Sequence, residues 1–286
     1  MTGSSLRRQD SPYLRVRSAL AEQAGESLAR ELPRGYHRIG QAALVRIPER
    51  LLPWERVIGE SYRKVLGVDL VLRQDRIQKG ASRAPGVFVI AGTRPSIDVT
   101  DGGIVWRTDP TRLMFSKGNM EERHRMARIA QPGEVVADLF AGIGYFALPL
   151  ARYCHPRAVV AVEKNPVAFA FLEENIRLNR LENCVSARLG DNRAIDLPRG
   201  SFDRVLMGYL PSALPFLDRA AELLHPGGGW VHLHTVVSTR CGDRLVRSIT
   251  ERVQRAGRGL QAMRIRRVKS YGPSRDHVVA DLLLVG

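Results

Sequence analysis

The stretch Asp138-Leu-Phe-Ala-Gly-Ile-Gly-Tyr-Phe146 predicts the architecture of the chain. An apolar run ends in an acidic residue, and a turn of small residues leads into a helical pattern. Gly142 and Gly144 let the backbone adopt positive φ and approach a ligand closely. In open α/β sheets, ligands bind at the carboxyl ends of the strands, so this turn marks a binding site. The third glycine of G-x-G-x-x-G is absent, which favours a cationic or ribose-bearing ligand over a dinucleotide.

Strand patterns alternate with helix patterns on both sides of this turn. We expect strands at Val135–Phe140, Ala158–Glu163, Cys184–Leu189, Asp203–Met207, Gly228–Val237, Leu260–Lys269 and Val278–Val285. We expect helices at Met120–Ala130, Tyr145–Tyr153, Pro166–Asn179, Ala213–Leu224 and Gly242–Ala256. Asn119 and Glu122 have the spacing of a capping box for the first helix. The alternation predicts an α/β fold with a mostly parallel seven-stranded sheet and an antiparallel hairpin at one edge.

The pattern before residue 110 differs and predicts a separate small unit. Short strands are expected at Ala42–Ile47, Val68–Leu72, Val87–Ala91 and Ile104–Trp106. We therefore divide the chain into an N-terminal extension (1–34), a small α+β domain (35–110) and a catalytic domain (111–286). The extension carries a helical pattern over Ser18–Arg30.

Composition excludes several classes of protein. The 286 residues are 44% hydrophobic and 26% charged, which is typical of a globular protein. The net charge is +15, and arginine supplies 39 of the 44 basic residues. This excess favours a polyanionic partner, although a solvated basic surface or a GC-rich genome would give the same excess. The three cysteines show no CxxC, and the N-terminus lacks an apolar run. We expect a cytoplasmic protein without membrane segment, disulfide or zinc site.

Acidic residues follow three successive strands of the expected sheet. Asp138 ends the first strand, Glu163 ends the second, and Asp191 with Asn192 follows the third. A carboxylate at the second position can accept hydrogen bonds from both ribose hydroxyls, and the Asp–Asn pair can contact adenine. Any one such acid is more often a cap or turn residue, but three in this order indicate a nucleoside site.

This order resembles the class I S-adenosylmethionine-dependent transferases, and further motifs narrow the resemblance. The segments Phe115-Ser-Lys-Gly-Asn-Met-Glu-Glu-Arg-His-Arg-Met126, Val162-Glu-Lys-Asn-Pro-Val-Ala168, Leu172-Glu-Glu-Asn-Ile-Arg-Leu-Asn179 and Gly190-Asp-Asn-Arg193 accompany the glycine turn. Together with Tyr36-His-Arg-Ile-Gly40 they resemble the tRNA guanosine-37 N1-methyltransferases and the related wyosine-pathway aminocarboxypropyltransferases of archaea and eukaryotes. The resemblance covers residues 35–286.

The resemblance implies S-adenosylmethionine as group donor, without a metal. It places cofactor contacts at Ser116, Arg123, Glu163, Asp191 and Asn192, beside the glycine turn. Arg123 can hold the methionine carboxylate, and its alternative role is a surface ion pair on the helix.

The segment Met207-Gly-Tyr-Leu-Pro-Ser212 bears on which reaction is catalysed. The N1-methyltransferases carry Asn-Leu-Pro here, and N1 of guanine must lose a proton during methylation. Met-Gly-Tyr resembles the aminocarboxypropyltransferase branch. That resemblance implies transfer of the 3-amino-3-carboxypropyl group to C7 of 4-demethylwyosine at position 37 of tRNA(Phe), with release of 5′-methylthioadenosine. Tyr209 is a weak candidate for the general base, and stacking or packing is its more common role.

Other roles remain open from the sequence. The alternatives are guanosine-37 N1-methylation, a non-catalytic RNA-binding protein on the same scaffold and, less favoured, a small-molecule methyltransferase. His232 and His234 share one strand face, but no third metal ligand is evident. The anticodon loop of tRNA(Phe) is the expected partner, and no protein partner is inferred. Basic residues near the C-terminus are candidates for phosphate contacts, namely Arg252, Arg255, Arg258, Arg264, Arg266, Arg267 and Lys269.

Overall fold

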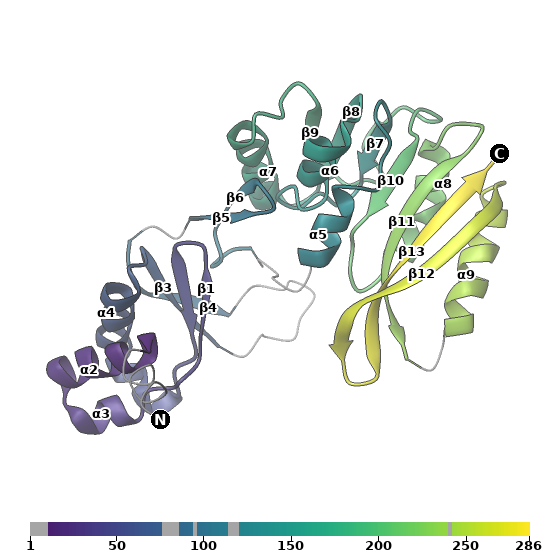
Figure 1. Ribbon diagram of the computed structural model, residues 1–286. Coiled ribbons are helices and arrows are strands. Elements are labelled where there is room, and N and C mark those ends of the chain that lie inside the picture. The colour runs from purple at the N-terminus through teal and green to yellow at the C-terminus, as the bar shows by residue number, and fades with distance from the viewer. Residues whose placement is uncertain (1–10, 76–85, 94–95, 114–119, 240–241) are drawn as a thin grey trace, which may run out of the picture. The chain divides into compact units, whose positions relative to one another are not determined.

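The computed structural model describes residues 11–75, 86–93, 96–113, 120–239 and 242–286 (Figure 1). The chain forms two compact units. For the described residues, the first spans Met1–Thr100 and Trp106–Phe115, and the second spans Asp101–Val105 and Ser116–Gly286.

The first unit contains a four-stranded sheet in the order β1-β2-β3-β4. Its strands are β1 (Tyr36–Ile39), β2 (Ala42–Val45), β3 (Leu70–Gln74) and β4 (Val87–Ala91). β2 and β3 are parallel, and the other two pairs are antiparallel. A separate two-stranded sheet joins β5 (Ile97–Asp101) and β6 (Ile104–Thr108). The sequence patterns identified β2, β3, β4 and β6 but not β1 or β5.

The N-terminal helices belong to the core of this unit. They are α2 (Pro12–Ala24) and α3 (Glu26–Arg30), followed by a 3-10 turn, η1 (Glu49–Trp54), and α4 (Glu55–Leu66). Val16 and Leu20 of α2 pack in one cluster with Ile58 and Tyr62 of α4. Gly25, at φ 92°, interrupts the single helix that the pattern over Ser18–Arg30 predicts.

The second unit contains the predicted seven-stranded sheet, in the order β12-β13-β11-β10-β7-β8-β9. Its strands are β7 (Val135–Asp138), β8 (Ala158–Glu163), β9 (Val185–Leu189), β10 (Arg204–Met207), β11 (Gly229–Ser238), β12 (Gly259–Gly272) and β13 (Arg275–Val285). The five strands β7 to β11 are parallel, and β13 runs antiparallel to both β11 and β12. The expected mostly parallel sheet with a hairpin at one edge is confirmed.

Helices cover both faces of this sheet. The helices are α5 (Met120–Met126), α6 (Ala147–Cys154), α7 (Pro166–Leu178), α8 (Leu217–Leu223) and α9 (Gly242–Arg255). Leucines of α8 and α9 pack with Val231 and Leu282 in the main core. Since strand residues alternate between faces, His232 and Asp281 lie on the opposite face. There Arg125 of α5 contacts Asp281, which in turn contacts His232. In the part of the chain that the structure describes, no helix is long and apolar enough for a bilayer span.

Two predicted helices are shorter than expected. The helix expected at Met120–Ala130 ends at Met126, a few residues before Pro132 and Gly133. The helix expected at Ala213–Leu224 is a 3-10 turn, η3 (Leu214–Phe216), followed by α8. Pro215 lies in this 3-10 turn, and α8 begins after it at Leu217. Asn119 lies outside the described residues.

Arg258 closes the end of α8. Its guanidinium donates hydrogen bonds of 2.9–3.1 Å to the carbonyls of Ala221, Leu224, His225 and Pro226. The last carbonyls of a helix have no intrahelical donor, so this side chain satisfies groups that would otherwise face partly buried surroundings.

We therefore expect Arg258→Ala to lower the free energy of unfolding by about 1.5–3 kcal/mol. Arg255→Ala, at an exposed arginine near the end of α9, is the matched control and should change it by less than about 0.5 kcal/mol. Urea unfolding followed by circular dichroism measures both. Equal effects of the two substitutions would contradict the structural role of Arg258.

Candidate functional site

A cavity of about 500 Å³ opens at the carboxyl ends of β7, β8, β9 and β10. The residues that line it come from the loops after these four strands, and Phe216 comes from η3. They are Leu139, Phe140, Gly142, Tyr145, Glu163, Lys164, Asp191, Asn192, Arg193, Gly208, Tyr209 and Phe216. Four of the predicted cofactor contacts, Gly142, Glu163, Asp191 and Asn192, therefore meet in one cavity.

The glycine turn needs its glycines for conformation and space. Gly142 and Gly144 have φ of 58° and 100°. A Cβ atom at Gly144 would lie 2.6 Å from Cγ of Leu148, and one at Gly142 would lie 3.2 Å from the Tyr145 ring. Gly144 does not line the cavity, so its role is to allow the backbone conformation of the turn and its close packing against Leu148.

Glu163 holds the turn through its carboxylate. Oε2 accepts a 2.7 Å hydrogen bond from the backbone N–H of Gly142, and Oε1 accepts one of 2.7 Å from Asn165. Each carboxylate oxygen retains a second lone pair. The side chain can therefore support the turn and still accept hydrogen bonds from a ribose.

Asp191 lies between two cations. Its carboxylate accepts hydrogen bonds from Lys164 Nζ at 2.8 Å and from Arg193 Nη2 at 2.7 Å. The hydrogen bonds from Arg193 and then Lys164 hold the pKa of this carboxyl well below its usual range. Asp191 is thus a permanent anion at the cavity rim.

Asn192 presents a buried acceptor. Its Nδ2 donates to the Leu139 carbonyl at 3.0 Å, while Oδ1 has no hydrogen-bond partner among the described residues. A buried polar atom without a partner costs roughly 1–3 kcal/mol, and a ligand donor such as an adenine amine would remove that cost. This acceptor, the ribose-competent Glu163 and the close backbone approach at Gly142 fit S-adenosylmethionine.

Asp138 lies beneath the turn instead of in the cavity wall. It is fully buried, and Oδ1 accepts a 3.2 Å hydrogen bond from Phe140 N–H. Burial raises its pKa to about 7. Its place in the structure is that of an internal support for the turn.

Arg123 is buried next to the cavity. Only 2% of the residue is exposed, and its guanidinium lies 4.6 Å from the centroid of the Tyr145 ring. Burial lowers its pKa, while Tyr145 and Asp101 act in the opposite direction. The alternative role of a surface ion pair does not fit this burial, and the neighbouring Glu122 pairs with Arg125 at 2.6 Å. Ser116 lies outside the described residues.

Three aromatic rings form one wall. Tyr209 is 44% exposed and stacks on Phe140, with 5.0 Å between ring centroids and 21° between planes. Phe216 contacts both rings edge-on. Met207 is fully buried in the main core, so the cavity receives only the backbone of Gly208 and the ring of Tyr209 from this segment.

A buried polar network, which the sequence patterns did not reveal, lies on the α5 side of the sheet. Glu122 is fully buried and also pairs with Arg266. Arg125 joins it to Asp281 at 3.0 Å, and Asp281 contacts His232 Nδ1 at 2.5 Å. The sequence signal that could have indicated this network is the presence of polar residues within otherwise apolar strands. No group of three His, Cys, Asp or Glu suited to a metal occurs within the described residues.

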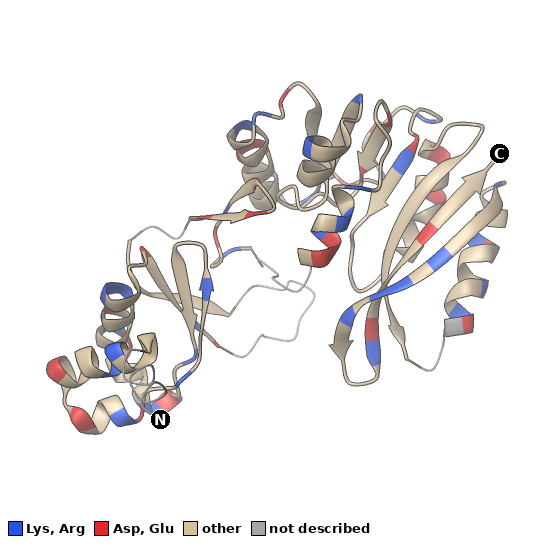
Figure 2. Cartoon of the chain, in the orientation of Figure 1, with Lys and Arg blue, Asp and Glu red and all other residues tan. Residues whose placement is uncertain are grey.

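The predicted phosphate contacts divide into two groups. Arg258 and Arg266 are engaged inside the fold. Arg252 pairs with Asp218 at 3.1 Å, and Lys269 is partly buried. Arg255 and Arg264 are exposed, and Arg267 pairs with Asp276 while its side chain stays 61% exposed. In Figure 2 the positions of lysine and arginine, coloured blue, recur along β12 and α9.

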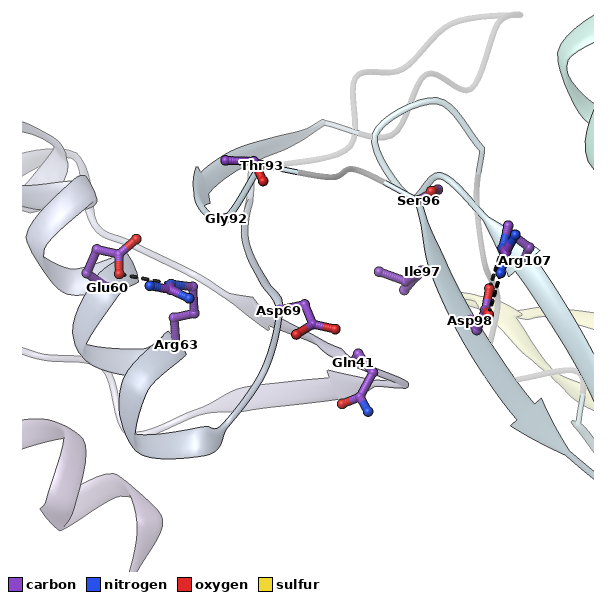
Figure 3. Close-up of a pocket in the computed structure, with 10 residues that line it drawn as sticks. All are labelled: Gln41, Glu60, Arg63, Asp69, Gly92, Thr93, Ser96, Ile97, Asp98 and Arg107. Atoms are coloured by element: carbon purple, nitrogen blue, oxygen red, sulfur yellow. Dashed lines mark hydrogen bonds and ion pairs between the residues drawn. The ribbon is translucent and has the colours of Figure 1, made fainter.

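A second cavity, of about 720 Å³, lies wholly within the first unit (Figure 3). Two ion pairs line it, Glu60–Arg63 at 2.9 Å and Asp98–Arg107 at 2.7 Å. It contains none of the predicted cofactor residues, so the cavity at the sheet is the candidate active site.

The raised pKa of Asp138 predicts a pH-dependent stability. In the folded state the Asp138 carboxyl keeps its proton up to about pH 7, whereas in the unfolded chain it releases the proton near pH 4. The contribution of the protonated carboxyl to the free energy of unfolding is therefore lost as pH rises from 4 to 7. The free energy of unfolding of Asp138→Asn should therefore rise relative to that of the wild type, by up to about 1.4 kcal/mol for each pH unit over this range.

Chemical unfolding at pH 5, 6, 7 and 8 tests this. Asp203→Asn is the matched control, because this half-exposed carboxylate also accepts a backbone N–H, from Val135. A difference between Asp138→Asn and wild type that stays constant across the series would contradict the account.

A family model described as "TRM5/TYW2 methyltransferase domain" matches residues 98–261, and one described as "TYW2 N-terminal domain" matches residues 16–95. The chain is 36% identical to the tRNA(Phe) (4-demethylwyosine(37)-C(7)) aminocarboxypropyltransferase of Pyrococcus horikoshii, over 94% of this chain and 95% of that protein.

Two solved structures are similar along most of the chain. The structure of P. horikoshii TYW2 in complex with MeSAdo has a TM-score of 0.84 and 34% identity, covering 96% of this chain and 99% of that one. The structure of M. jannaschii TYW2 in complex with AdoMet has a TM-score of 0.72 and 32% identity, covering 88% and 99%. The glycine turn, the acids after successive strands and the preceding small domain thus agree with these matches, and the chain belongs to the TRM5/TYW2 family.

Proposed function

We propose that this protein transfers the 3-amino-3-carboxypropyl group of S-adenosylmethionine to C7 of 4-demethylwyosine at position 37 of tRNA(Phe). The observation that carries the proposal is the similarity to the P. horikoshii aminocarboxypropyltransferase, which extends over nearly the whole of both chains. The co-product is 5′-methylthioadenosine, because the bond that breaks joins sulfur to Cγ of the methionine chain.

The segment after β10 supports C7 rather than N1 as the nucleophile. Methylation of N1 needs a group that engages the guanine edge and takes its proton. At this point the cavity receives no amide or carboxylate, because Met207 is buried and Gly208 has no side chain. C7 of an electron-rich tricyclic base attacks without prior deprotonation, so its reaction does not need such a group.

The residues of the cavity have separate tasks in this reaction. Glu163, Asp191 and Asn192 hold the nucleoside part of S-adenosylmethionine through their oxygen atoms. Arg123 is the candidate for holding the methionine carboxylate, and we infer that it turns Cγ rather than the methyl group toward the base. All three carbons on the sulfonium are electrophilic, so positioning selects among them.

The substrate base is held by stacking and the tRNA by its phosphates. Bases of RNA loops are commonly recognised on aromatic faces, and Tyr209 offers an exposed ring stacked on Phe140. Arg255, Arg264 and Arg267 are exposed and can contact phosphates of the anticodon stem and loop.

A two-label transfer assay tests the proposal. S-adenosylmethionine labelled on its carboxyl carbon should label tRNA(Phe) that carries 4-demethylwyosine, and methyl-labelled donor should not. Unmodified tRNA(Phe) with guanosine at position 37 is the control acceptor and should gain neither label. Methyl label on the unmodified tRNA would show a guanosine methyltransferase instead.

Tyr209 variants test the stacking role. Tyr209→Ala should lower kcat/KM for the tRNA roughly 5- to 150-fold, because stacking contributes about 1–3 kcal/mol per base. Tyr209→Phe keeps the ring and should retain activity near that of the wild type. A Tyr209→Phe variant as slow as Tyr209→Ala would instead assign chemistry to the hydroxyl.

A further inference from the structure

Arg193 is an exposed cation at the mouth of the active-site cavity. It follows Asp191 and Asn192 in the loop after β9, and its side chain is 63% exposed. Its guanidinium is therefore accessible to a large ligand, whereas that of Arg123 is buried. Among the described residues that line this cavity, Lys164 and Arg193 are the two with a positive charge. They mark the part of the mouth that suits an anionic ligand.

Asp191 holds one edge of the Arg193 guanidinium. Arg193 Nε donates to Oδ1 of Asp191 at 3.0 Å, and Nη2 donates to Oδ2 at 2.7 Å. Such a bidentate pair fixes the plane and the orientation of the group. A guanidinium has five N–H donors, so three of them point away from Asp191. Arg193 is thus oriented in advance, with a free edge for a second oxyanion.

Lys164 adds a second cation to this pair. Its Nζ lies 2.8 Å from Asp191 Oδ2, and its side chain is 70% exposed. The hydrogen bonds from Arg193 and Lys164 keep the pKa of Asp191 well below its usual range, so its carboxylate stays ionised and cancels one of the two positive charges. The second acid that lines the cavity, Glu163, is directed to the backbone of the glycine turn. The three side chains at the mouth therefore retain one positive charge.

Aromatic contacts connect Arg193 with the ring proposed to stack on the substrate base. Cζ of Arg193 lies 5.6 Å from the centroid of Phe216, and Phe216 lies edge-on to Tyr209 with 5.9 Å between centroids. One side chain thus separates Arg193 from the exposed ring of Tyr209 at the same cavity. A nucleotide whose base stacks on Tyr209 keeps its phosphates in water at the mouth, because a charge is costly to bury. Its phosphates then lie close to these cations.

We propose that Arg193, with Lys164 beside it, binds a backbone phosphate that flanks nucleotide 37 of tRNA(Phe), an inference that rests on the proposed function. The free edge of the guanidinium donates to the phosphate oxygens, while Asp191 keeps the other edge in place. A planar guanidinium matches a phosphate in this way better than an ammonium group does. The contact fixes the backbone of the nucleotide whose base Tyr209 holds. Arg193 is therefore a positioning residue and takes no part in the bond changes at C7 and Cγ.

Binding measurements without catalysis test the proposal. Arg193→Ala should raise the Kd for tRNA(Phe) on the order of 10-fold, the low end for a hydrogen bond to a charged group, because the mouth is open to solvent. The slope of log K against log salt concentration should fall by about one, as for the loss of one phosphate contact. Arg193→Lys keeps the charge and should recover part of the affinity. Calorimetry with S-adenosylmethionine should give a Kd near that of the wild type for both variants.

Arg199→Ala is the matched control for this series. Arg199 is an arginine of the same unit with a side chain that is 76% exposed, and it pairs with Glu222 at 3.8 Å. It does not line the cavity. Its substitution should leave both the affinity for tRNA(Phe) and the salt dependence as in the wild type.

A neutral phosphate analogue locates the contact. Synthetic anticodon stem-loops of tRNA(Phe) carry a methylphosphonate at one of the phosphates around nucleotide 37 at a time. One of these substitutions should weaken binding to the wild type about as much as Arg193→Ala does. The same substitution should cost Arg193→Ala little further affinity, because the two changes remove one interaction. Additive losses at every phosphate would overturn the proposal.

A second outcome would also overturn it. If Arg193→Ala binds tRNA(Phe) as the wild type does but loses affinity for S-adenosylmethionine, Arg193 only supports Asp191 in the donor site. Failure of the proposed function is distinguishable from both outcomes, because the wild type would then transfer no carboxyl label to the modified tRNA, whatever its affinity for the RNA.

Discussion

The buried carboxylate of Glu122 is the constraint on which the arrangement around the active site depends. A charge removed from water is costly unless it is paired and hydrogen-bonded. Glu122 is fully buried on the short helix α5, and Arg125 of that helix and Arg266 of β12 neutralise it. These ion pairs attach α5 to the β12–β13 hairpin. The attachment fixes Arg123, the next residue of α5, beside the ring of Tyr145 at the cavity.

The need to pair buried polar groups also accounts for part of the arginine content. A net charge of +15 favours a polyanionic partner, but part of the arginine excess is used inside the protein. Arg204 pairs with Glu134 at 2.7 Å, and Arg258 holds the carbonyls at the end of α8. Planar guanidinium groups suit such multiple hydrogen bonds better than lysine does. The exposed arginines of α9 and β12 are not used in this way and remain candidates for contacts with RNA.

Local sequence patterns predicted most of the sheet, because the signals for strands and for glycine turns depend on residues that are close together in the sequence. β8 has the predicted bounds, and most other strands of the second unit differ by a few residues. The side chains of Glu163, Asp191 and Asn192 meet as expected, since parallel strands bring their carboxyl ends to one edge. Patterns did not predict the Glu122 network, because it joins segments that lie over a hundred residues apart in the sequence. They also placed Asp138 with the ligand contacts, although it lies beneath the turn.

In the proposed reaction, the site presents Cγ of the methionine chain, rather than the methyl group, to a carbon nucleophile. The sulfur-containing co-product reports that choice most directly. Incubation with S-adenosylmethionine and tRNA(Phe) bearing 4-demethylwyosine, followed by chromatography of the nucleosides, measures it. The account predicts 5′-methylthioadenosine in amounts equal to the modified tRNA formed. S-adenosylhomocysteine as the co-product of tRNA modification would contradict it.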